Sequence, residues 1–116
     1  MKFKLIIALV TDDNVDVILE TARECGATGC TVITSARGEG LKPPTTFLGL
    51  TLEGHRDVVL LLVEEHLSRH ILESIAAAGR FDEEPGAGMA FQLDIEDAIG
   101  LRSQIGTIEE EIEDEI

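Results

Sequence analysis

Two glycines, Gly86 and Gly88, flank Ala87 in a turn-rich part of the chain and have the clearest chemical potential. Glycine lets the backbone approach a ligand closely, so that neighbouring N–H groups can converge on an anion such as a phosphate. A Gly-Ala-Gly turn also commonly does no more than lead the chain into a strand. The motif by itself leaves both interpretations open.

Two histidines, His66 and His70, are four residues apart in a segment with helical periodicity, and Glu73 follows one turn later. This spacing places both imidazoles on one helix face, where they could bind a divalent metal ion. The same positions lie opposite the apolar residues Leu67 and Ile71, which favours a solvated face. We expect the solvated face, with a metal site at His66 and His70 as the alternative.

The two cysteines, Cys25 and Cys30, are too few for a disulfide scaffold and lack the partners of a structural zinc site, which favours a reducing compartment. Cys25 falls on the apolar face of a predicted helix and Cys30 enters a predicted strand, so we expect both to be small core residues. The sequence offers no nucleophile with an adjacent base and no pair of carboxylates in an apolar setting. We therefore expect no enzymatic activity.

The charge balance excludes several classes of partner. Nine Lys and Arg against 23 Asp and Glu give a formal charge of -14, which repels nucleic acids and anionic lipid surfaces. No apolar stretch approaches the roughly 20 residues that span a bilayer, and acids follow the first apolar run where a secretory signal would be cleaved. We expect a cytoplasmic protein.

Hydrophobic periodicity predicts the elements that position these residues. Apolar runs predict strands over residues 3–10, 30–35, 57–63 and 89–95. Amphipathic patterns predict a helix that is capped by Asp12 or Asp13 and ends at Gly26, and a second helix over residues 64–78 that ends at Gly79. Residues 47–52 are also apolar and are interpreted as an arm of the third strand, with a bend at Gly54.

The element order β-α-β-β-α-β is that of the ferredoxin-like α+β fold, an antiparallel sheet with both helices on one face. The length of 116 residues fits one domain, which we place at residues 1–104, followed by an acidic C-terminal tail at residues 105–116. The first, third and fourth strands are apolar at nearly every position, so the sheet face without helices would expose a large apolar patch. We expect self-association over this face.

Two segments of the sequence resemble the PII signalling proteins. Residues 26–40, GATGCTVITSARGEG, are similar to the end of the first helix, the second strand and the glycine turn of that family. Residues 78–102, AGRFDEEPGAGMAFQLDIEDAIGLR, are similar to the end of its second helix, its glycine loop, its last strand and a late arginine. The resemblance implies a homotrimeric signalling protein with adenine nucleotide clefts between neighbouring subunits and a loop that contacts a partner protein.

The resemblance also implies the residues that contact the nucleotide. One group matches a short Thr-Gly-x-Thr stretch and the turn that borders the base and sugar, and another matches the phosphate loop and a phosphate-contacting arginine. These positions are Gly29, Thr31, Arg37, Gly38, Gly40, Gly86, Ala87, Gly88, Met89 and Arg102.

Departures from the family pattern lower the positive charge of the implied cleft. Ala87 and Met89 stand where the family has an acid and a lysine, and Gly100 stands where a further arginine is usual. Three acids at residues 82–84 precede the loop and raise the cost of binding a polyanion. We therefore expect a nucleotide of low charge, with AMP or ADP favoured over ATP.

The partner loop implied by the resemblance, residues 41–56, is short, contains no tyrosine for covalent modification, and has Lys42 where the family has an amide that helps to hold a metal. We expect it to contact a protein target such as a transporter or an enzyme. The alternative, from a different functional class, is a trimeric metal-binding or metal-tolerance protein of the same fold that uses His66 and His70.

Overall fold

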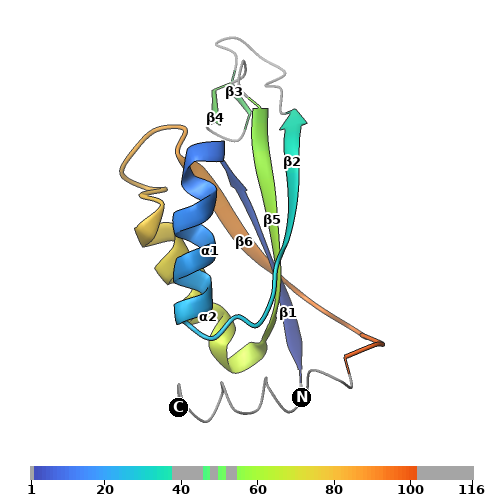
Figure 1. Ribbon diagram of the computed structural model, residues 1–116. Coiled ribbons are helices and arrows are strands. Elements are labelled where there is room, and N and C mark those ends of the chain that lie inside the picture. Colours follow the sequence, from blue (N-terminus) through green and yellow to red (C-terminus); the bar gives the residue numbers. More distant parts are fainter. Residues whose placement is uncertain (1, 38–45, 48–49, 52–54, 102–116) are drawn as a thin grey trace.

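A computed structural model describes residues 2–37, 46–47, 50–51 and 55–101 (Figure 1). The elements in chain order are β1 (Phe3–Val10), a short 3-10 turn η1 (Asp12–Asn14), α1 (Val15–Glu24), β2 (Thr31–Arg37), β3 (Thr46–Phe47), β4 (Leu50–Thr51), β5 (His55–Glu64), α2 (Glu65–Ala78) and β6 (Gly88–Asp94). The four long strands and two helices follow the predicted order.

The four long strands form one antiparallel sheet in the order β2-β5-β1-β6. Both helices pack against each other on one face of this sheet (Figure 1). The arrangement is the ferredoxin-like α+β fold that the element order predicted. Neither α1, with 10 residues, nor α2, with 14, is long and apolar enough to cross a membrane.

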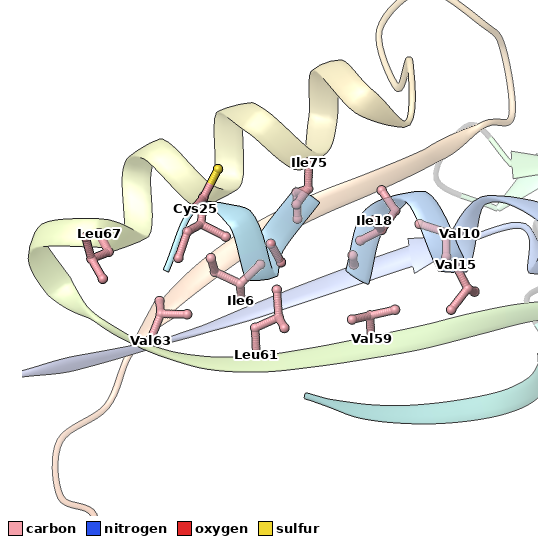
Figure 2. Packing of buried hydrophobic residues seen from close by; sticks show 13 residues of the cluster. Ile6, Val10, Val15, Ile18, Cys25, Val59, Leu61, Val63, Leu67 and Ile75 are labelled. Carbon is pink, nitrogen blue, oxygen red and sulfur yellow. The ribbon is translucent and has the colours of Figure 1, made fainter. Parts of the chain in front are cut away.

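The core lies between the sheet and the two helices (Figure 2). Because side chains alternate along a strand, every second residue of β1 and β5 points to the helices. These strand residues are Ile6, Ala8, Val10, Val59, Leu61 and Val63. Helix residues at three- and four-residue spacing complete the core: Val15, Ile18, Ala22, Leu67, Ile71 and Ile75, with Cys25 just past the end of α1.

The opposite face of the sheet is apolar across all four strands. Residues directly opposite each other in an antiparallel register share a face. The register gives three rows: Ile33, Val58, Leu9 and Met89; Thr31, Leu60, Ile7 and Phe91; and Leu62, Leu5 and Leu93. Ile33, Phe91 and Leu93 are 50%, 37% and 48% exposed in the single chain. This surface, called the open face below, is the apolar patch predicted from the strand composition.

The start of α1 differs from the prediction. Asp12 and Asp13 are exposed residues of η1, and the residue that precedes α1 is Asn14, whose side chain makes no capping hydrogen bond to the helix. A short 3-10 turn thus joins β1 to the helix and displaces the helix start by one or two residues. The end of α1 is as predicted, because Gly26 adopts a φ of 108° that favours glycine.

The apolar segment before β5 also differs from the prediction. The two-residue strands β3 and β4 pair with each other in a separate sheet, so Phe47, Leu50 and Thr51 are not an arm of β5. Segments close together in sequence can pair at a small entropic cost, which favours this local pairing.

Candidate functional site

The start of β2 borders a hollow of about 480 Å³ on the open face. Gly29 and Thr31 line this hollow, which has an apolar floor of Leu5, Leu60 and Leu62. Thr28, Cys30 and Leu101 complete the lining. A Cβ added at Gly29 would meet no atom of this chain within 4 Å, so the space beside its backbone is open. An apolar floor with a polar rim of threonines and backbone suits a flat aromatic base.

A second hollow, of about 420 Å³, lies on the helix side of the same segment. Residues 27–30 and Leu61 line it opposite a charged stretch of α1 that includes Glu20 and Arg23. A hydrogen bond from Arg23 lowers the pKa of the Glu20 carboxyl below its ordinary value. Cys30 lines both hollows and is exposed, so the prediction that it is a core residue was wrong, whereas Cys25 is buried as expected.

A β-bulge shapes the far end of β2. The register with β5 shifts between Ile33 and Ala36, and Ser35 adopts a left-handed φ of 58°. The Ser35 N–H donates to Asp57 Oδ1 at 3.1 Å, and Asp57 is only 8% exposed. Bulges bend a strand and redirect the residues that follow. Arg37 ends the ladder opposite His55, while Gly38 and Gly40 lie outside the described residues.

The second group of predicted contacts includes Gly86 in the loop between α2 and β6 and Gly88 at the start of β6, and the two glycines are required for different reasons. Gly86 has a φ of 79°, which glycine adopts without strain. A Cβ added at Gly88 would lie 2.6 Å from Phe81 Cε1 and 3.0 Å from the Leu9 carbonyl oxygen. Ala87 between them is buried, and its N–H donates to the Glu84 carbonyl at 3.1 Å. The Ala87 N–H therefore has a partner within the chain.

Ion pairs within this loop partly neutralise its negative charge. Arg80 Nε lies 3.1 Å from Glu83 Oε2, and Arg80 Nη1 lies 2.9 Å from Glu84 Oε1. Two of the three acids at residues 82–84, Glu83 and Glu84, therefore form ion pairs with Arg80. These exposed pairs are each worth little in stability, but they offset negative charge close to Gly86. Met89 lies on the open face opposite Leu9 and supplies no charge.

Among the described residues, the two groups of predicted contacts lie at opposite edges of the sheet. Thr31 belongs to the edge strand β2 and Gly88 to the opposite edge strand β6, with β5 and β1 between them. At about 4.8 Å per strand, the two edges are roughly 14 Å apart. Arg102 lies outside the described residues. Within one chain, a ligand that contacts both groups would have to extend across β5 and β1.

The two histidines of α2, His66 and His70, are not grouped together as potential metal ligands among the described residues. In the part of the chain that the structure describes, one cluster of potential metal ligands is found. It contains Glu64, Glu65 and His66 but not His70. The buried Glu64 carboxylate accepts the His66 N–H at 2.6 Å as the N-cap of α2, and lies 2.5 Å from His66 Nδ1. The positive end of the helix dipole disfavours a cation there. Both histidines are exposed, as a solvated face requires.

Comparisons with known proteins extend this description. The family described as Nitrogen regulatory protein P-II matches residues 3–104. No curated protein matches the chain.

Solved structures with the same fold include CPII of Thiomonas intermedia K12 bound to ADP, AMP and acetate, with a TM-score of 0.65, 17% identity, and coverage of 84% of this chain and 90% of that one. A PII-like signaling protein of Thermus thermophilus has a TM-score of 0.60 and 22% identity over 82% and 87% of the two chains. The B. subtilis GlnK-ATP complex has a TM-score of 0.70 and 16% identity over 88% and 89%. At these identities the likeness concerns the fold.

Proposed function

Because the chain belongs to the nitrogen regulatory protein P-II family, a family of signalling regulators, we propose that it binds an adenine nucleotide between the subunits of a homotrimer and thereby regulates a partner protein. The observation that carries the nucleotide part is the hollow at residues 28–31, since its leucine floor and polar rim suit the faces and edges of a purine.

Two features of the single chain support self-association, and membership of the P-II family favours a homotrimer. The open face exposes Ile33, Phe91 and Leu93 beside half-buried leucines, and contiguous apolar surface of this kind is typical of an interface between subunits. The two groups of predicted ligand contacts lie at opposite edges of the sheet. Association of neighbours through the open face would cover the apolar surface and complete the nucleotide site in one step.

The charge of the loop favours AMP or ADP over ATP. Ala87 and Met89 carry no charge, and Arg80 is already paired with Glu83 and Glu84. Each additional phosphate charge therefore finds few compensating cations among the described residues of this loop. The structural relatives are compatible with either choice, since CPII is bound to ADP and AMP and GlnK is bound to ATP.

The signal would pass to a protein partner through residues 41–56, of which the structure describes residues 46–47, 50–51 and 55–56. The proposed domain comprises residues 1–104. The proposed acidic tail, residues 105–116, lies outside the described residues.

We propose a regulatory and not an enzymatic role, because the hollow at residues 28–31 offers threonines and one thiol without an adjacent base.

Isothermal titration calorimetry with AMP, ADP and ATP, followed by Zn²⁺, tests this function, and light scattering of the same sample gives the oligomeric state. We expect a mass three times the 12.6 kDa of the chain and tighter binding of AMP or ADP than of ATP. A protein that responds to Zn²⁺ and to no nucleotide would instead support the metal-binding alternative.

A further inference from the structure

Asn14 lies where η1 meets α1, but its side chain contacts a part of the chain more than 60 residues away. Its Nδ2 donates to the Gly79 carbonyl at 3.3 Å and to the Ala87 carbonyl at 3.5 Å. These carbonyls belong to the two ends of the loop that joins α2 to β6, which passes close to the start of α1 (Figure 1). One amide group therefore bridges the base of the loop.

Phe81 holds the same two ends from within the loop. Its ring lies against Gly79 and Gly88, and a Cβ on either glycine would collide with it. Gly79 has an ordinary helical φ of -84°, so the contact with Phe81 explains this glycine better than backbone conformation does. The loop thus has a compact base of Asn14, Gly79, Phe81, Ala87 and Gly88.

The amide of Asn14 is not needed for the helix that it precedes. An asparagine at a helix N-terminus commonly accepts a hydrogen bond from the first turn, yet Asn14 makes none to α1. Its two donated hydrogen bonds go to the loop instead. Both are long, so each holds the loop weakly, and their combined effect is to restrict where Gly86 and Gly88 lie.

We propose that Asn14 is a positioning residue for the phosphate of the bound nucleotide, acting through the loop that contains Gly86 and leads into Gly88. This inference rests on the proposed function, because the loop is the proposed phosphate contact. A loop already held in place loses less conformational entropy when it binds an anion. The role concerns the phosphate alone, since the base would occupy the hollow at the opposite sheet edge.

The test compares AMP with adenosine by calorimetry in the parent, in Asn14→Ala and in Asn14→Asp. Both variants remove the amide donor, and only Asn14→Asp adds a negative charge. We expect both to weaken AMP binding about fivefold, the effect of losing two weak hydrogen bonds, and to leave adenosine binding unchanged. Hydrogen exchange of the amides at residues 86–88 should become faster in both variants. Asp13→Ala, at the exposed neighbouring position, is the matched control and should bind AMP at least as well as the parent.

The outcomes separate this inference from the proposed function. A parent that binds neither AMP nor adenosine would overturn the proposed function and this inference with it. A parent that binds AMP, with Asn14→Ala binding it equally well, would overturn the role of Asn14 alone. Loss in Asn14→Asp only would indicate a charge effect, and equal loss of AMP and adenosine in Asn14→Ala would indicate a general structural role; either result contradicts the proposal.

Discussion

Asp57 is a buried carboxylate that accepts the N–H of Ser35 at the bulge of β2. Because Ser35 has a left-handed φ, the bulge depends on this hydrogen bond more than a regular ladder position would. We expect Asp57→Ala to lower the free energy of unfolding by about 1 kcal/mol, because the Ser35 N–H loses its acceptor in a part-buried hydrogen bond. Asp57→Asn keeps an oxygen acceptor and should cost less. Urea denaturation measures both, and equal stability of Asp57→Ala and the parent would contradict the role given to this carboxylate.

Arg102 is the cation to which the family resemblance assigns a phosphate contact. A guanidinium can make two charge-assisted hydrogen bonds to one phosphate, so Arg102→Ala should weaken AMP binding by about 2 kcal/mol, roughly thirtyfold. Arg37→Ala, next to the glycine turn, should have a smaller effect. Calorimetry with AMP measures both affinities, and light scattering should show an unchanged oligomeric state. If Arg102→Ala binds AMP as tightly as the parent, the cleft assignment fails although the fold does not.

At the scale of elements, the glycines of the two proposed contact segments differ in what the chain itself requires. Gly86→Ala forces a side chain onto a φ of 79° and should destabilise the protein by about 1 kcal/mol. Gly29→Ala meets nothing within 4 Å and should leave the melting temperature unchanged, which makes it a matched control. Differential scanning calorimetry of the ligand-free protein checks the pair, and an unstable Gly29→Ala would show that a neighbouring subunit fills that space.

Sequence patterns predicted the elements whose residues alternate or repeat with a fixed period. The apolar runs of β1 and β5 could be predicted from the sequence alone, and so could the helical stripe at Leu67, Ile71 and Ile75. Features set by contacts between distant segments were missed. Asp12 or Asp13 was the predicted cap, and only the fold shows that Asn14 directly precedes α1 and donates to the Gly79 carbonyl. Cys30 was expected to enter a strand as a core residue, but it precedes β2, lines two hollows and is exposed.

At the scale of the whole molecule, the sheet has a helix-covered face and an uncovered one, and both are apolar. The covered face buries Ile6, Val59 and Leu61. The uncovered face carries the hollow at residues 28–31 near one edge strand, while the glycine loop leads into the other. In the proposed homotrimer, assembly and ligand binding would therefore be coupled, since association through this surface would bring the two groups of proposed contacts together. Nucleotide binding should stabilise the assembled form by mass action.

Phe91 lies in the middle row of the open face, opposite Ile7, and is 37% exposed in the single chain. Phe91→Lys would bury an unpaired charge in an interface formed by that face, at a cost of several kcal/mol, so we expect it to dissociate the trimer into 12.6 kDa monomers. Val17→Lys replaces a similarly exposed apolar residue on α1, 40% exposed on the helix-bearing side, and should stay trimeric. Light scattering over a range of concentrations reports the mass of each variant. Because the nucleotide site would need two subunits, Phe91→Lys should also lose AMP binding while its circular dichroism remains that of a folded chain. A trimeric Phe91→Lys, or a monomeric Val17→Lys, would place the subunit interface on another surface.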